Sequence, residues 1–77
     1  MSRDKDNRES RILQEHRRAL GLTQGQVAAK AEIDLQSYQR YEYGIIRLSN
    51  ATMKTGLRIC DILKIDPREI VFGKEER

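Results

Sequence analysis

The stretch TQGQVAAKAEIDLQSYQRYEYG, residues 23–44, restricts the possible folds more than any other part of the chain. Thr23 can cap a helix at about 24–31, because its side-chain oxygen can accept a hydrogen bond from a backbone amide of the first turn. Asp34 can cap another helix at about 35–43 in the same way, and Gly44 can end it. Only two or three residues remain between the two helices, so they must meet at a steep angle.

Both helices have buried positions at helical spacing. These are Val27, Ala28 and Ala31 in the first helix and Ser37, Tyr38 and Tyr41 in the second. The small alanines let the two backbones approach closely, as a helix-turn-helix requires. Glu32 stands in the turn where glycine is most frequent, and a non-glycine residue at positive φ costs about 1 kcal/mol there. We therefore expect a slightly strained turn.

Another helix is predicted before this pair, at about 8–20. Asp6 and Glu9 have the spacing of a capping box, and Gly21 supplies a left-handed stop. The expected buried face has residues at three- and four-residue spacing, namely Ile12, Leu13, His16, Ala19 and Leu20. For His16, a half-buried imidazole with a neighbouring hydrogen bond is favoured over a catalytic or ligand role.

Two more helices are predicted after the pair. Ser49 or Asn50 can cap the first, whose apolar residues recur at helical spacing: Met53, Leu57, Cys60 and Leu63. Gly56 interrupts it, either as a close packing contact or as a weak point. The last helix is short, and its pattern consists of Asp66 as cap, Pro67 at the first position, Glu69 closing a capping box and Gly73 at the end.

The composition also favours an all-α fold. A chain of 77 residues has material for one small core, and its 35% of charged residues, 5% of aromatic residues and single proline are typical of a compact helical protein. We expect five helices in one domain at 8–73, between a flexible segment at 1–7 and a tail at 74–77.

Several classes of function are disfavoured by the residues present. One cysteine and one histidine give neither a disulfide framework nor the usual ligand set of a zinc site, so no metal or cofactor is expected. Cys60 lies in an apolar helical pattern and is assigned to the core. No nucleophile constellation or acid–base pair suggests an enzyme. No signal sequence or membrane span is recognised, so we expect a cytoplasmic protein that associates with the nucleoid and not with a membrane.

The chain resembles the phage-repressor and Cro type (XRE-like) of helix-turn-helix proteins over about residues 10–72. The resemblance rests on Arg17 before the run Gly-Leu-Thr-Gln at 21–24, on Val27 and Ala28, on Tyr41, Glu42 and Gly44, and on Ile59, Cys60, Asp61 and Leu63. It implies a compact lambda-repressor-like DNA-binding domain and a structural ion pair between Arg17 and Glu42, with two solvated charges as the alternative. Glu32, Gly56 and a longer loop after Gly44 depart from the family pattern, which puts the position of the fourth helix in question.

The resemblance also implies which side chains meet DNA. If residues 35–43 lie in the major groove, base contacts are expected from Gln36, Ser37, Gln39 and Arg40. Phosphate contacts are expected from Thr23, Gln24, Lys30, Tyr43 and Arg47. For Thr23 and Gln24 the alternative is helix capping alone. The net charge of +3 suits nucleic acid, yet residues 23–50 contain equal numbers of basic and acidic residues.

These expectations lead to a sequence-specific regulator of transcription, acting as a repressor. It would bind a two-fold symmetric double-stranded DNA operator as a homodimer, because one reading helix buries little surface. The candidate dimer residues are Ile70, Val71 and Phe72, whose alternative role is to close the monomer core. The alternative function is an antitoxin or other protein-interaction module with weak or lost DNA binding, whose partner would be a toxin or another protein. A phage repressor, a restriction-modification controller and an antitoxin all fit the residues.

Overall fold

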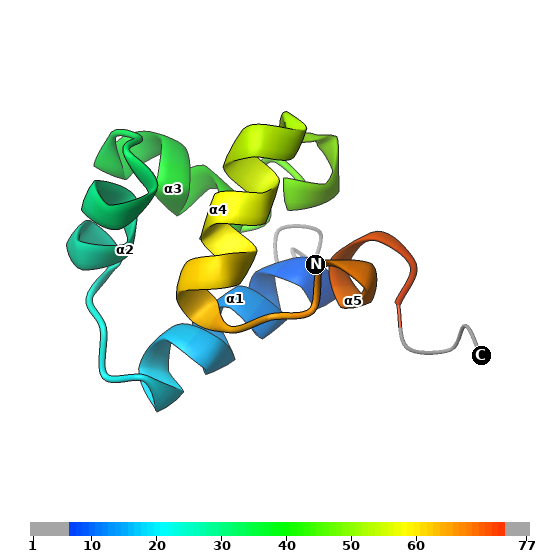
Figure 1. The fold of residues 1–77 in the computed structure, drawn as a ribbon, viewed down its shortest axis with the longest axis horizontal. Coiled ribbons are helices and arrows are strands. Elements are labelled where there is room, and N and C mark those ends of the chain that lie inside the picture. Colours follow the sequence, from blue (N-terminus) through cyan, green and yellow to red (C-terminus); the bar gives the residue numbers. More distant parts are fainter. Residues whose placement is uncertain (1–6, 74–77) are drawn as a thin grey trace.

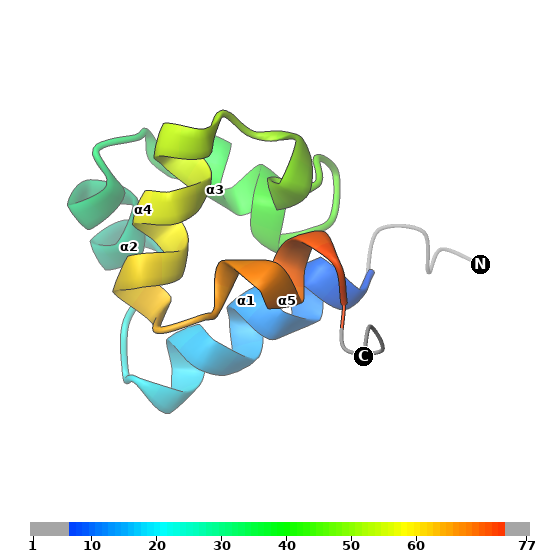
Figure 2. The ribbon, with the colours of Figure 1, turned by 45° about the vertical axis from the view of Figure 1, so that its right-hand side comes forward.

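The computed structural model describes residues 7–73 and contains five α-helices and one short 3₁₀ helix. The elements are α1 (Arg8–Ala19), α2 (Gln24–Ala31), α3 (Leu35–Glu42), η2 (Leu48–Asn50), α4 (Met53–Leu63) and α5 (Pro67–Val71). The described residues form no strand, and α4 lies between the α2–α3 pair and α5 (Figures 1 and 2). The prediction of an all-α fold with five helices is confirmed.

Each α-helix begins at a side chain that accepts a hydrogen bond from a first-turn amide. The five caps are Asn7, Thr23, Asp34, Thr52 and Asp66. Two of them differ from the expectation. Asn7 caps α1, and the residue expected in that role, Asp6, lies outside the described residues. Thr52 caps α4, because Ser49 and Asn50 belong to η2.

Glu9 does not serve the cap of its own helix. Its carboxylate is buried and accepts hydrogen bonds from the backbone amide of Ser49 at 3.3 Å and from the Ser49 hydroxyl at 2.8 Å. This contact joins the first turn of α1 to η2, in the long connection between α3 and α4. Leu48 beside it is buried, so the connection is anchored by one polar and one apolar contact.

The core draws apolar side chains from every α-helix and from η2. Its buried members are Leu13, Val27, Ala28, Ala31, Tyr38, Leu48, Ile59, Cys60, Leu63, Ile65 and Ile70. The expected burial of Ala19, Leu20, Met53 and Leu57 is wrong, because all four are exposed. On α4 the buried face runs through Ile59, Cys60 and Leu63, so that Met53 and Leu57 lie toward solvent.

Two helices end at a non-glycine residue in the left-handed region. Glu32 ends α2 with φ 63°, and Lys64 ends α4 with φ 58°. The helix-turn-helix thus keeps its left-handed turn although glutamate occupies it, and Glu32 forms an exposed ion pair with Arg58 at 3.2 Å. At Gly56 an added Cβ would have no atom within 4 Å, so the expected alternative of a close packing contact is wrong.

Side chains from the first and last turns of α1 complete two other helix ends. Arg8 donates to the carbonyl oxygens of Glu69 at 2.6 Å and Ile70 at 3.2 Å, in the last turn of α5. The Nδ1 atom of the half-buried His16 lies 2.9 Å from the carbonyl oxygen of Leu63, the last residue of α4. These carbonyls lack partners within their own helices, so α1 satisfies them from outside.

Candidate nucleic-acid interface

The angle between α2 and α3 is fixed by the three-residue turn 32–34. Glu32 reverses the chain in the left-handed conformation, and Asp34 then caps α3 by accepting from the amide of Ser37. Ala28 and Ala31 are buried where α2 meets the rest of the domain, and Ile33 packs against the core from the turn. A larger side chain at either alanine would force the helices apart, because protein interiors leave no spare volume.

The carboxylate of Glu42, at the end of α3, joins the first three helices. It accepts from Arg17 Nε of α1 at 2.5 Å, from the Tyr38 hydroxyl at 2.6 Å and from Gln24 Nε2 of α2 at 2.9 Å. Its side chain is 1% exposed, and that of Arg17 is 15% exposed. The expected pair of Arg17 and Glu42 is therefore an enclosed ion pair with two further donors, and it orients α3 against α1 and α2.

The surroundings of this cluster determine which of its groups are charged. Burial alone would raise the pKa of Glu42, but hydrogen bonds from Arg17, Tyr38 and Gln24 outweigh it and lower that pKa. The hydrogen bond to Glu42 raises the pKa of Arg17. Burial, followed by the hydrogen bond to Glu42, raises the pKa of Tyr38. At neutral pH the cluster thus contains one carboxylate, one guanidinium and a neutral phenol.

The outward side of α3 holds most of the side chains expected to read bases. Gln36, Gln39 and Arg40 line one shallow hollow together with Tyr43 and Ile45. Gln36 and Arg40 are exposed and Gln39 is half-buried, so the three present amide and guanidinium groups to solvent from consecutive turns. These are the group types that pair with adenine and guanine edges in a major groove.

A hydrogen bond links this row to the start of α2. Gln39 donates from Nε2 to the Oε1 atom of Gln24 at 3.1 Å, and Gln24 Nε2 lies 3.4 Å from the Tyr43 hydroxyl. Gln24 also donates to Glu42. One expected base-contact residue, Gln39, is therefore connected to two expected phosphate-contact residues, Gln24 and Tyr43, and through them to the buried ion pair.

Ser37 is placed differently from the other members of the row. Its hydroxyl donates to Asp34 at 2.8 Å and its amide bonds the same carboxylate at 3.3 Å. These hydrogen bonds, the hydroxyl's foremost, lower the pKa of Asp34. The Ser37 hydroxyl hydrogen is thus engaged in the cap of α3, on the side of the helix nearer the turn.

The start of α2 offers backbone donors. Thr23 accepts from the amide of Gln26, and the Gln26 side chain accepts from the amide of Thr23, which forms a complete capping box. The amides of Gln24 and Gly25 bond no acceptor among the described residues. A helix N-terminus with free amides attracts anions such as phosphate, because the amide dipoles point outward.

The remaining expected phosphate contacts are spread over the surface. Arg47 is exposed and stands immediately before η2. Lys30 lies elsewhere, because it lines a hollow with Leu20, Leu22, Asp61, Ile62 and Lys64 and not with the α3 row.

With Glu42 buried and paired, residues 23–50 expose three cations, Lys30, Arg40 and Arg47, against two carboxylates, Glu32 and Asp34. The segment is slightly positive at its surface, which composition alone does not reveal.

Two apolar residues of this surface were absent from the expected contact set. Leu35, the first residue of α3, is 43% exposed, and Ile45, just beyond α3, is 58% exposed. Each stands beside an expected base reader, Leu35 next to Gln36 in sequence and Ile45 in the same hollow as Arg40. No sequence pattern indicated the exposure of Leu35, because its three-residue spacing from the buried Tyr38 is that of a shared helix face.

The proposed dimer residues divide between core and surface. Ile70 is buried in the monomer, whereas Val71 and Phe72 are 57% and 66% exposed.

Cys60 is buried as expected, and burial, with the charge of Asp66, raises the pKa of its thiol to about 11. Within residues 7–73 no cluster of three or more His, Cys, Asp or Glu side chains could hold a metal ion. No helix of that part is both long and apolar enough to span a bilayer.

Comparison with protein families gave a match to the family described as Helix-turn-helix over residues 13–70. The matched segment runs from the middle of α1 into α5 and includes both helices of the motif. Comparison with curated proteins and with solved structures gave no match.

Proposed function

This chain belongs to the helix-turn-helix family of the Cro and phage-repressor type, whose members are DNA-binding regulators, and we propose that it is a repressor acting as a homodimer. Its operator would be double-stranded DNA with two-fold symmetry. The observation that carries the proposal is the link between Gln39 on the outward side of α3 and Gln24 at the start of α2. Through this link a group able to read a base is held beside amides able to hold a phosphate.

In the proposed complex α3 lies in the major groove, which is about 12 Å wide and admits one helix. Gln36 and Gln39 would pair with adenine and Arg40 with guanine, while Leu35 would contact a thymine methyl group. Ser37 contributes less, since Asp34 already holds its hydroxyl. Specificity then comes from four side chains on one face of α3.

Phosphates would be bound on either side of α3. The free amides of Gln24 and Gly25, with the Thr23 hydroxyl, suit one phosphate at the start of α2. The Tyr43 hydroxyl and Arg47 suit the backbone beyond the end of α3. Lys30, in its separate hollow, lies outside this set.

Dimerisation is proposed because one α3 of eight residues offers few base contacts. Two copies related by a two-fold axis would place their reading helices in successive major grooves, about 34 Å apart. Val71 and Phe72 are exposed apolar residues that such a contact could cover, whereas Ile70 remains in the core of its own subunit.

The test is selection of binding sites from random duplexes, followed by comparison of Gln36→Ala and Arg40→Ala on single-base variants of the selected site. Each variant should lose about 1–3 kcal/mol of discrimination at one base pair. Arg68→Ala removes an equal charge from α5 and should leave every base preference unchanged. The affinity of the unaltered protein should also fall steeply with salt, because bound phosphates release counterions.

Two outcomes would contradict this proposal at different levels. Equal loss on every sequence would show that Gln36 and Arg40 do not read bases. The absence of binding to any duplex at low salt would favour the second candidate, a protein-interaction module such as an antitoxin. One observation favours that candidate. The exposed cations of residues 23–50 outnumber the exposed carboxylates only slightly, so this segment attracts phosphate weakly.

A further inference from the structure

The end of α3 places Ile45 beside Arg40. Gly44 takes the left-handed conformation with φ 77°, and its amide donates to the carbonyl oxygen of Tyr41 at 3.3 Å. The next amide, that of Ile45, donates to the carbonyl oxygen of Arg40 at 2.9 Å. These two hydrogen bonds form a Schellman motif, which brings the second residue after the helix cap against the third residue from the helix end. The position of Ile45 relative to Arg40 is therefore fixed by the backbone.

The same motif ends α1, but its apolar residue has different surroundings there. Gly21 has φ 72°, and its amide donates to the carbonyl oxygen of Arg18 at 3.0 Å. The amide of Leu22 donates to the carbonyl oxygen of Arg17 at 3.1 Å. Leu22 is half-buried and packs against the core, whereas Ile45 is 58% exposed and lies outside the core. Packing within the domain thus explains the apolar residue at the end of α1 but not the one at the end of α3.

The hollow beside Ile45 combines its aliphatic side chain with groups that can bind bases. This hollow has a volume of about 260 Å³, and its other lining residues are Gln36, Gln39, Arg40 and Tyr43. Among residues 7–73 the Arg40 guanidinium has no hydrogen-bond or ion-pair partner, so it can bind the two acceptors of a guanine. The apolar group that a base pair presents in the major groove is the C5-methyl group of thymine. An isoleucine fixed beside a free guanidinium therefore suits a methylated pyrimidine beside a guanine.

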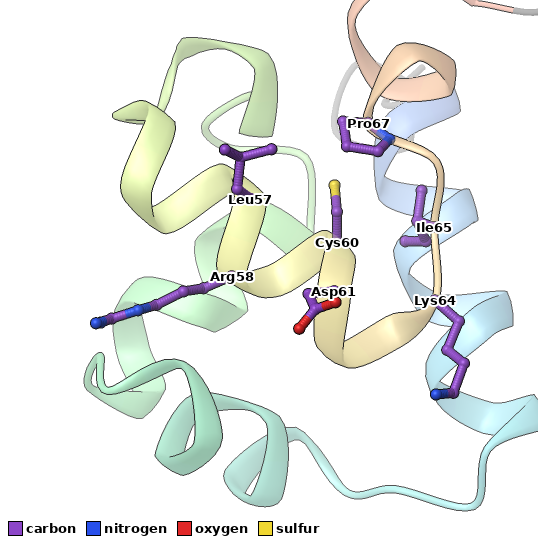
Figure 3. Close-up of a pocket in the computed structure, with 7 residues that line it drawn as sticks. All are labelled: Leu57, Arg58, Cys60, Asp61, Lys64, Ile65 and Pro67. Atoms are coloured by element: carbon purple, nitrogen blue, oxygen red, sulfur yellow. The ribbon is translucent and has the colours of Figure 1, made fainter.

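A wider hollow along α4 lacks this combination. It has a volume of about 540 Å³, and Figure 3 shows the sulfur of Cys60 pointing toward Pro67 while Arg58 extends away from both. The Arg58 guanidinium is already paired with Glu32 at 3.2 Å. The arginine of that hollow is thus engaged within the domain and stands apart from the apolar centre.

We propose that Ile45 contacts the C5-methyl group of a pyrimidine in the base pair next to the guanine that Arg40 binds. This pyrimidine is thymine in ordinary DNA, and 5-methylcytosine carries the same methyl group in methylated DNA. Gln36 stands one turn before Arg40, and Ile45 lies beyond the end of α3. The methylated pyrimidine is therefore on the side of the guanine away from the base pair that Gln36 contacts. The proposal rests on the proposed function, because it names bases that the same surface would select.

The test compares synthetic duplexes that differ by one methyl group. The starting duplex is the site selected from random sequences, and the position beside the guanine contains thymine, uracil, 5-methylcytosine or cytosine in turn. Burial of one methyl group should make each methylated base bind about fourfold more tightly than its unmethylated counterpart. A difference between thymine and uracil alone, or between 5-methylcytosine and cytosine alone, would support the contact and identify the base that makes it.

Two substitutions assign this difference to Ile45. Ile45→Ala keeps the backbone hydrogen bonds of the motif but removes most of the aliphatic surface, so methylated and unmethylated duplexes should bind equally. Ile46→Ala is the matched control, because Ile46 is 39% exposed and does not line the hollow. This control should keep the about fourfold difference. Ile45 is largely exposed, so Ile45→Ala should melt close to the temperature of the unaltered chain.

The possible failures point to different errors. Equal binding of methylated and unmethylated duplexes by the unaltered chain would overturn the proposal and leave the proposed function in place. A methyl effect that survives in Ile45→Ala, or that occurs only on the side of the guanine facing the base pair of Gln36, would also overturn it. The absence of binding to every duplex at low salt would overturn the proposed function, and the contact of Ile45 with it.

Discussion

The two sides of this molecule are held together by different kinds of contact. Around Glu42, α1, α2 and α3 meet through a buried carboxylate with three donors. Around Cys60 and Ile70, α4 and α5 meet chiefly through apolar side chains and leave a groove open at Gly56. Hydrogen bonds to a buried charge require particular directions, whereas apolar contacts tolerate substitution and small shifts. The side that bears α3 is thus fixed in angle, whereas the side of α4 and α5 keeps an open apolar groove.

Replacing Glu42 with glutamine should test the polar side and have the largest effect. The substitution leaves the enclosed guanidinium of Arg17 without its counter-charge, and breaking a buried pair in this way costs about 3–5 kcal/mol. Denaturant unfolding of the two proteins would measure the cost. Arg58→Gln breaks the exposed pair with Glu32 and should cost no more than about 1 kcal/mol. Equal costs for the two substitutions would show that the enclosed pair stabilises the fold no more than the exposed pair does.

Acid should weaken the same side by a smaller amount. The hydrogen bonds to Glu42 lower its pKa below the usual value of 4.5, so the unfolded chain binds this proton more readily than the folded one. The stability that this group contributes is present above about pH 4.5 and is lost as the pH falls through the lower folded-state pKa. The difference in unfolding free energy between the unaltered protein and Glu42→Gln should therefore narrow in acid. A difference that stays constant throughout the acid range would show that the carboxylate is not held ionised.

One left-handed helix end occurs on each side, and the same substitution at both should have the smallest effect. Glycine at Glu32 or Lys64 relieves strain of about 1 kcal/mol but adds freedom to the unfolded chain, so the net gain is below about 1 kcal/mol. Lys64→Gly should stabilise at least as much as Glu32→Gly, because only Glu32 loses an ion pair. Thermal melting would compare them, with Glu32→Ala as the control that keeps the strain. A melting temperature for Glu32→Gly below that of Glu32→Ala would argue against a strained turn.

The helices of this chain could be predicted because their signals are local. Thr23 and Asp34 cap α2 and α3 within a few residues, and the predicted range 24–31 coincides with α2. Hydrophobic spacing also identified α4 and two of its buried residues, Cys60 and Leu63, but it wrongly added Met53 and Leu57. Met53 and Leu57 fit the same period as Cys60, and the way the other helices pack against α4 decides which of its turns are covered.

The sequence indicated most of the residues of the candidate site, but it did not indicate the hydrogen bonds that connect them. Gln39 and Gln24 were both expected to contact DNA, yet no periodicity indicates that their amides bond each other across two helices. The same holds for Glu9 and Ser49, which are 40 residues apart in the chain. Lys30 shows the converse, since its place on α2 suggested a phosphate contact while the packing of α4 gives it a different neighbourhood. Contacts of this kind depend on how helices cross, which local sequence does not encode.

The contact of Arg8 with the last turn of α5 brings the first and last described helices together. Their outer ends could be joined by a short linker without disturbing the core, and the chain could be opened instead in the exposed stretch 45–47. The arrangement of the helices in the fold would then not depend on the order in which they occur along the chain. A circularly permuted chain of this design would carry α3 near its new end and still form the same buried contacts.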